Sequence, residues 1–206
     1  MFYDRKDAGK RLAAALEHYC GEDAVVLALP RGGVVVGYEV AHILGLPLDI
    51  VVARKIGHPT NPEYAIGAVD ESGVALLNEA EEKAVDQIWL MGEVERQRQE
   101  AARRSMLYRG GKKALPISGK IVVIVDDGIA TGLTVRLAIA IARAQHPKQI
   151  IVAVPVAPLN MVQKIKWEAD EVITLEPPED FLGAVGSHYE QFAQVEDAEV
   201  IRLIGS

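Results

Sequence analysis

Runs of apolar, mostly β-branched residues recur along the chain and alternate with segments of helical periodicity. These runs lack the apolar–polar alternation of half-exposed strands, which is typical of strands that helices cover on both faces. We expect such buried strands at residues 24–29, 48–53, 121–125, 149–156 and, more weakly, 171–175. The pattern therefore predicts a doubly wound α/β fold with a mainly parallel sheet and helices on both faces.

Helical segments lie between these strands. A helix that Asp7 would cap carries Leu12 and Leu16 at helical spacing. Further helices are expected over residues 34–44 and after Gly132. The regular alternation of strand and helix supports the doubly wound arrangement.

The middle of the chain interrupts this alternation. Residues 54–64 are rich in proline, glycine and charge and are predicted to form a polar loop, and a small hairpin is expected around residues 70–73. Residues 79–106 are predicted to form one long helix, whose polar half is a solvated face or, alternatively, docks against a partner subunit. We expect a single domain, residues 1–206, in which residues 54–78 form a candidate mobile loop and hairpin.

Composition and charge exclude several classes of protein. Half of the 206 residues are hydrophobic and a quarter are charged, which excludes a disordered or collagen-like chain. A net charge of −7 argues against broad binding to nucleic acid or to anionic membranes. Cys20 is the only cysteine and is interpreted as a small buried hydrophobe. Because neither a targeting signal nor a membrane-spanning run is recognised, we expect a cytoplasmic protein.

The strongest chemical signal follows the strand at residues 121–125. Asp126 and Asp127 stand where this strand ends, at the edge where open α/β sheets bind ligands. A short loop then leads into a helix, whose free N–H groups and positive dipole end favour an anion, and Thr131 and Thr134 add hydroxyl donors. Carboxylates bind polyols and the loop binds phosphate, so the spacing fits a 5-phosphorylated ribose.

Other motifs explain the chain less well. There is no Walker A sequence, and the glycines of residues 32–37 lack the spacing of a dinucleotide-binding loop. A phosphorelay receiver also has paired acids at a strand end, but no threonine–glycine anion loop directly after them. The five histidines show no metal-ligand spacing, so a protein-bound zinc ion is not expected.

The two acids and the loop resemble a known motif. The segment Val125-Asp126-Asp127-Gly128-Ile129-Ala130-Thr131-Gly132-Leu133-Thr134 is similar to the phosphoribosyl pyrophosphate (PRPP) motif of type I phosphoribosyltransferases. The resemblance implies that Asp126 and Asp127 bind the ribose hydroxyls. It also implies a 5-phosphate site formed by Ala130, Thr131, Gly132, Leu133 and Thr134. The chain departs from the family pattern at Gly128, which replaces a bulky apolar residue, and at Leu133, which replaces a common second glycine.

A second segment, Leu29-Pro30-Arg31-Gly32-Gly33, also joins a strand to a helix. It resembles the pyrophosphate loop of the family, in which a cis peptide bond is common. The resemblance implies that Pro30, Arg31, Gly32 and Gly33 bind pyrophosphate, and that Arg31 makes a bidentate contact. An ordinary turn with a surface arginine is the alternative.

Lys55 follows another predicted strand, as does the mobile catalytic loop of the family, which closes over PRPP and excludes water. The resemblance implies that Lys55 also contacts pyrophosphate and acts with Arg31, Asp126 and Asp127 in catalysis. An ordinary surface loop is the alternative. The basic stretch at residues 103–120 is interpreted as solvated, and contact with the pyrophosphate of a neighbouring subunit is the alternative.

The acidic residues 176–206 are expected to form a hood over the nucleobase. Some purine-specific relatives stack an aromatic side chain on the base, which makes Phe181 a candidate base-binding residue, and filling the sheet edge is the alternative. Relatives that act on 6-oxopurines usually carry an acid where this chain has Ala130. Adenine, orotate, uracil or another acceptor is therefore favoured over hypoxanthine and guanine.

The resemblance implies a Mg²⁺-dependent pentosyltransferase of nucleotide metabolism. It would move ribose 5-phosphate from PRPP to a nitrogen nucleophile, such as a nucleobase, and release pyrophosphate. Mg²⁺ would be chelated mainly by PRPP, with a position near Asp126 and Asp127 as one arrangement. A homodimer is implied in the same way, with no nucleic-acid or membrane partner. A PRPP-binding regulator without catalysis is the alternative.

Overall fold

The computed structural model describes residues 1–176 and 178–205, and these contain a five-stranded sheet in the order β2-β1-β6-β7-β8. Every neighbouring pair in this sheet is parallel. Its strands are β1 (Ala24–Ala28), β2 (Leu48–Ile50), β6 (Ile121–Val125), β7 (Gln149–Val154) and β8 (Glu171–Thr174). The mainly parallel sheet predicted from the apolar runs is confirmed.

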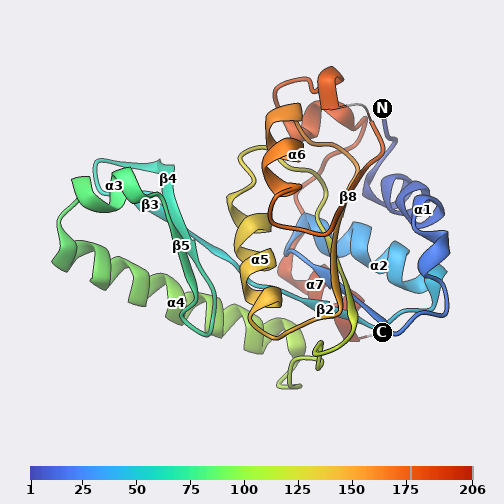
Figure 1. Cartoon of the computed structure of the whole chain (residues 1–206), viewed down its shortest axis with the longest axis horizontal. Helices are drawn as coiled ribbons and strands as arrows, with labels where there is room; N and C mark the ends of the chain where they lie inside the picture. Colours follow the sequence, from blue (N-terminus) through green and yellow to red (C-terminus); the bar gives the residue numbers. More distant parts are fainter. Residues whose placement is uncertain (177, 206) are drawn as a thin grey trace.

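Helices cover both faces of the sheet (Figure 1). One face packs against α1 (Arg5–Ala15) and α2 (Gly32–Leu44), and the other packs against α5 (Leu133–Arg143) and α6 (Leu159–Ile165). Successive residues of β1 point to opposite faces, so Val25 and Leu27 pack with α5, whereas Val26 packs with α1 and α2. The doubly wound fold is therefore confirmed. None of the described helices is long and apolar enough to span a membrane.

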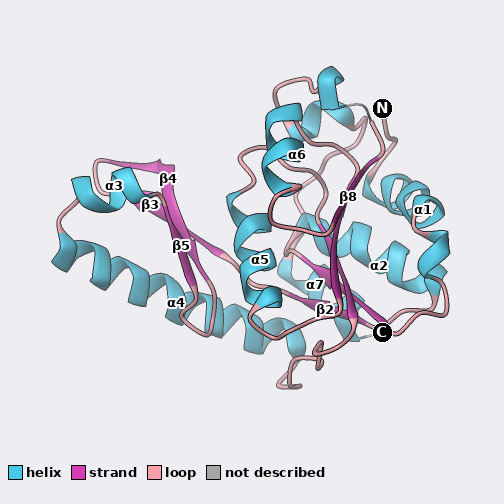
Figure 2. Ribbon diagram, viewed as in Figure 1, coloured by secondary structure: helices cyan, strands magenta, loops and turns pink. Residues whose placement is uncertain are grey.

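A second, antiparallel sheet projects from the side of this core (Figures 1 and 2). It consists of β3 (Arg54–His58), β4 (Asn61–Val69) and β5 (Ala75–Leu77), and α3 (Glu79–Ala84) and α4 (Gln87–Arg109) follow it in the chain. Residues 54–109 are termed the arm. A separate cluster of apolar side chains, including Ile56, Ile66 and Leu90, holds the arm together.

The prediction of a polar loop at residues 54–64 is wrong, because much of this segment is strand. Arg54 lies opposite Val69 in the β3–β4 pair. Pro59 lies in the turn between these strands, and Pro62 lies near the turn, where shifts of register make the pairing irregular. Neither proline therefore interrupts the regular part of the ladder. The hairpin expected around residues 70–73 is present as the connection between β4 and β5.

Three further predictions need correction. The long helix at residues 79–106 is two helices, because Val85 is extended and the Asp86 side chain caps α4 by accepting from the Trp89 N–H at 2.8 Å. Asp4 rather than Asp7 caps α1. Cys20 is exposed rather than buried, since the preceding tyrosine fills the core in its place.

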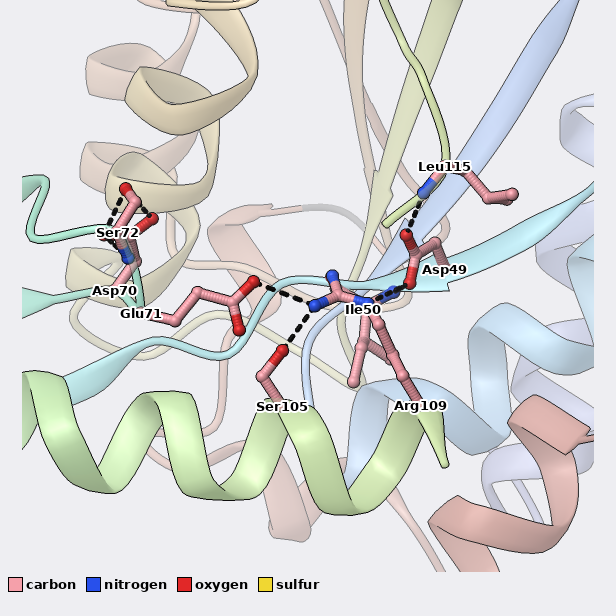
Figure 3. A network of polar contacts seen from close by, with 8 residues as sticks. All are labelled: Asp49, Ile50, Asp70, Glu71, Ser72, Ser105, Arg109 and Leu115. Atoms are coloured by element: carbon pink, nitrogen blue, oxygen red, sulfur yellow. Dashed lines mark hydrogen bonds and ion pairs between the residues drawn. The ribbon is translucent and has the colours of Figure 1, made fainter. Parts of the chain in front are cut away.

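A buried polar network joins the root of the arm to the core sheet (Figure 3). Arg109, at the end of α4, donates from Nε to Asp49 at 2.8 Å, from Nη1 to Glu71 at 2.8 Å and from Nη2 to the Ile50 carbonyl at 2.7 Å. Asp49 also accepts from the N–H groups of Ile50 and Leu115, each at 2.8 Å. Burial lowers the pKa of Arg109, but its ion pairs outweigh this effect and raise that pKa. The solvated interpretation is therefore wrong for Arg109.

Candidate functional site

The carboxyl ends of β1 and β6 bring the two predicted ligand loops together. The strands pair in register up to Ala28 and Val125, and the Leu29 N–H donates to the Val125 carbonyl at 3.0 Å. Because the two strands are adjacent and parallel, the loop after each one starts at the same edge of the sheet. Residues 30–33 therefore lie beside residues 126–134.

Gly32 and Gly33 lie directly against the two acids. A Cβ atom on Gly32 would stand 2.0 Å from Oδ2 of Asp127, and one on Gly33 would stand 2.8 Å from Oδ1 of Asp126. A Cβ atom on Gly33 would also stand 2.9 Å from the backbone Cα of Asp126, so position 33 requires glycine, whereas a side chain at position 32 would displace the Asp127 carboxylate and Arg5. The peptide bond that precedes Gly32, between Pro30 and Arg31, is cis. The predicted pyrophosphate loop and the pair Asp126 and Asp127, termed the diacid, thus form one continuous group of residues.

The predicted 5-phosphate loop forms the start of α5. Gly132 has φ +72° and directly precedes Leu133, the first residue of this helix. Ala130 and Thr131 are exposed, and Leu133 and Thr134 are partly exposed, so a ligand can reach this loop. The first N–H groups of a helix have no acceptor within it, and the positive end of the helix dipole lies beside them. The loop is therefore suited to bind an anion.

A cavity of about 670 Å³ separates this loop from the arm. Its walls come from both parts of the chain: Lys55, Tyr64, Ala65, Ile66, Leu76, Leu77 and Asn78 from the arm, and Thr131, Leu133, Arg136 and Lys164 from the core. Lys55 and Thr131 thus line the same space, although they are far apart in the sequence. Lys55, Arg136 and Lys164 contribute cationic groups to the wall of this cavity, and Arg136 is paired there with Glu168 at 2.6 Å.

Arg31 is adjacent to the two glycines in the chain, but its side chain is directed toward the start of α7 (Asp197–Gly205). Its Nη1 lies 3.8 Å from a carboxylate oxygen of Glu196 and 3.6 Å from one of Asp197. These pairs are long and solvent-accessible, so they are weak. Contact between Arg31 and pyrophosphate stays a prediction, and it would require the side chain to leave these two carboxylates.

Phe181 belongs to a small core within the hood. Its ring stacks on His188 with centroids 5.3 Å apart, and it packs against a cluster that contains Phe2, Val156 and Tyr189. This environment favours the alternative reading of Phe181 as a packing residue, and its contact with a base stays a prediction.

The same part of the hood explains why Gly128 departs from the family pattern. A Cβ atom on Gly128 would stand 2.5 Å from Cγ1 of Val185 and 2.8 Å from Cγ2 of Val156. The two valines thus occupy the space that a bulky side chain at position 128 would need. Val156 after β7 and Val185 of the hood thus fill the space in place of that side chain.

Two residues that the sequence analysis did not identify hold Asp127 in place. The Arg5 Nε donates to Oδ2 of Asp127 at 2.7 Å, and these side chains are only 12% and 16% exposed. The Tyr189 hydroxyl donates to the Asp127 carbonyl at 2.5 Å. Arg5 and Tyr189 are 122 and 62 positions from Asp127 in the sequence, so only the folded chain reveals the contacts.

The two acids of the motif differ in their electrostatic environment. Burial, together with repulsion from Asp127, raises the pKa of Asp126 well above its ordinary value. Asp126 accepts from the Asp127 N–H at 2.8 Å, whereas the Asp127 carboxylate has the Arg5 guanidinium as counter-ion. A carboxyl group that retains its proton can donate a hydrogen bond as well as accept one, which suits a pair of neighbouring hydroxyls.

Comparisons with known proteins identify the family of the chain. The family model of the phosphoribosyl transferase domain matches residues 2–191. A Mycobacterium tuberculosis protein, described provisionally as a phosphoribosyl transferase, is 44% identical over 206 residues, which are 99% of this chain and 46% of that protein. The chain thus spans about half the length of the curated relatives that it matches.

Solved structures show that the fold also occurs in other proteins. The crystal structure of the Thermus thermophilus protein TT1426 has a TM-score of 0.84 and 43% identity, and the match covers 98% of this chain and 97% of that one. A hypoxanthine phosphoribosyltransferase from Staphylococcus aureus, at 15% identity and a TM-score of 0.50, covers 86% of this chain and 75% of its own and is similar in fold alone. Because the family model covers nearly the whole chain, the chain belongs to the phosphoribosyltransferase family.

Proposed function

We propose that the chain transfers ribose 5-phosphate from PRPP to a nitrogen nucleophile and releases pyrophosphate. The observation that carries this proposal is the contact of Gly32 and Gly33 with Asp127 and Asp126, beside the start of α5. Three adjacent features, a backbone loop, a diacid and a helix start, correspond to the pyrophosphate, the ribose diol and the 5-phosphate of one PRPP molecule.

Each part of the site has a separate role in this proposal. Asp126 and Asp127 hold the ribose hydroxyls, and the loop at residues 130–134 holds the 5-phosphate. The backbone of residues 30–33 receives the pyrophosphate. Arg31 and Lys55 supply positive charge near the departing group, because one precedes the two glycines and the other lines the cavity.

The reaction breaks the bond between C1 of the ribose and a pyrophosphate oxygen, which leaves with the electron pair. The nitrogen of the acceptor forms the new bond to C1. Positive charge develops on the ribose as negative charge develops on the leaving group. The chain would therefore act by holding the two reactants in line, by placing cations near the pyrophosphate and by excluding water from the cavity.

Magnesium enters this proposal as part of the substrate, the Mg–PRPP complex. Among the residues that the structure describes, no group of three or more His, Cys, Asp or Glu side chains is placed to hold a metal ion. The acids of the motif have suitable oxygen ligands, but Asp127 is already paired with Arg5. The residues present do not fit a metal ion held by the protein alone.

Calorimetry with PRPP and Mg²⁺, followed by a screen for pyrophosphate release, tests the proposal. Binding, together with release in the presence of adenine, orotate, uracil or another nitrogen acceptor, would support it. Binding without release for any acceptor would instead favour a PRPP-binding regulator. Failure to bind PRPP would refute both functions.

The Asp127→Asn variant tests the role of the diacid. We expect turnover to fall by at least about 100-fold while the circular dichroism spectrum is unchanged, because an interaction with the reacting sugar is lost. Glu22→Gln is the matched control, since Glu22 is exposed and precedes β1, at the opposite edge of the sheet. Unchanged turnover in the folded Asp127→Asn variant would remove the diacid from the mechanism.

A further inference from the structure

The chain supplies its own cation to the diacid. The Arg5 Nε donates to Oδ2 of Asp127 at 2.7 Å, and both side chains are largely buried. An arginine side chain keeps its positive charge at any pH at which a protein is folded. The carboxylate that the family motif would offer to a ligand therefore has a permanent counter-ion within the protein.

Arg5 is also fixed from other directions. Its Nη1 donates to the Ala193 carbonyl at 2.7 Å, and its Cζ lies 3.8 Å from the centroid of the Phe192 ring. This cation–π contact and the two charge-assisted hydrogen bonds hold the guanidinium between the hood and the diacid. Arg5 is thus an ordered part of the site rather than a mobile surface side chain.

The space beside Asp127 is filled. A Cβ atom on Gly32 would stand 2.0 Å from Oδ2 of Asp127 and 2.8 Å from the Arg5 Nε, so the carboxylate and the guanidinium pack against the backbone of the glycine loop. A Mg²⁺ ion requires octahedral oxygen ligands at about 2.1 Å and keeps several water molecules. On this side of Asp127, Arg5 occupies the volume that the ion and its water would need.

We propose that Arg5 is a built-in counter-ion that excludes divalent cations from Asp126 and Asp127, so that magnesium reaches the site only in complex with PRPP. The first part concerns the protein without substrate, and only the second part rests on the proposed function. Without a cation beside it, the Asp127 carboxylate would attract a hard divalent ion, which would complete its site by displacing the proton of the neighbouring Asp126 carboxyl group. Removal of Arg5 should therefore create a metal site at the diacid.

The experiment measures Mn²⁺ binding without PRPP, from the electron paramagnetic resonance signal of free Mn²⁺. We expect wild-type protein to bind Mn²⁺ at least 10-fold more weakly than Arg5→Gln, and the tighter site to disappear in the double variant Arg5→Gln/Asp127→Asn. Arg5→Lys, which keeps the charge, should behave like the wild type. Arg11→Gln is the matched control, because Arg11 lies on the same helix but is exposed and pairs with Asp7 at 2.7 Å.

Equal Mn²⁺ binding by wild type and Arg5→Gln, whether tight or absent, would overturn the proposal. So would an additional Mn²⁺ site in Arg5→Gln that survives the Asp127→Asn change.

A second measurement needs no variant. In wild-type protein, Mn²⁺ alone should leave the amide NMR signals of Asp127 and Gly128 sharp, whereas Mn²⁺ with PRPP should broaden them. Broadening by the ion alone would contradict the role of Arg5. If calorimetry detects no PRPP binding, the proposed function fails, but the comparison with the metal alone still decides the role of Arg5.

Discussion

The network around Arg109 allows a quantitative prediction about stability. In the Arg109→Met variant, the Asp49 carboxylate loses its counter-ion but stays buried, since its side chain is only 6% exposed. The N–H groups of Ile50 and Leu115 remain as its hydrogen-bond donors. Glu71, at 34% exposed, can turn to water when its partner is removed. The cost of the variant therefore arises mainly at Asp49.

The magnitude follows from the burial of this pair. Removing one partner of a buried ion pair costs about 3–5 kcal/mol, because a charge is left without compensation. Two backbone donors still hold Asp49, so we expect a loss at the lower end, about 3 kcal/mol. For a chain of this size, each kcal/mol lowers Tm by about 2–4 °C. The melting temperature should therefore fall by about 6–12 °C.

Urea unfolding at constant pH, together with scanning calorimetry, measures this loss. Arg103→Met is the control, because Arg103 pairs with Glu100 on the surface, so its loss should leave the midpoint nearly unchanged. The double variant Asp49→Asn/Arg109→Met should recover part of the loss, since it no longer buries an unpaired charge. A loss below about 1 kcal/mol for Arg109→Met, or a double variant less stable than the single one, would refute this reasoning.

Further predictions concern the acids and the hood. Burial and the neighbouring Asp127 raise the pKa of Asp126, so above about pH 4 the folded chain retains a proton that the unfolded chain releases. The free energy of unfolding therefore falls as pH rises. The melting temperature of Asp126→Asn minus that of wild type should therefore increase from pH 5 to pH 8. A difference that stays constant over this range would contradict the raised pKa. Gly128→Ala should lose about 1–3 kcal/mol in urea unfolding through its clash with Val185, and the added Val185→Ala change should restore part of this. Tyr189→Phe should lose about 1 kcal/mol in the same assay through the missing hydrogen bond to the Asp127 carbonyl, and an unchanged midpoint would show that this bond contributes nothing.

The sequence was sufficient for the parts of the fold that depend on local patterns. Continuous apolar runs identified the core strands, because burial on both faces leaves no place for polar alternation. The motif at residues 125–134 and the loop at residues 29–33 were both placed at strand ends, and the pairing of β1 with β6 brings those ends together. The sequence thus predicted which two loops meet at the candidate site.

The remaining features depend on contacts between distant residues. Arg5 and Tyr189 carry no motif, and their contacts with Asp127 arise only when the hood folds back over the sheet. Arg109 lay within a basic stretch typical of a solvated surface, but Asp49 and Glu71 give it buried partners. Composition favoured a loop at residues 54–64, whereas pairing with β4 made much of it a strand. Tertiary contacts outweighed local propensity at these positions.

The outer part of the arm can act as a lever with its pivot near Ala101, because Ala101 and Tyr108 of α4 pack in a core cluster with residues of α2 and α7. From Gln87 to this pivot, α4 is about 21 Å long. A rotation of about 10° at the pivot would displace the far end by about 4 Å, given that length. Lys55 pairs with Ala68, close to the Glu71 that bonds Arg109, and would move far less. One small angular change would therefore widen the outer mouth of the cavity while Lys55 stays at its wall, which it shares with Thr131.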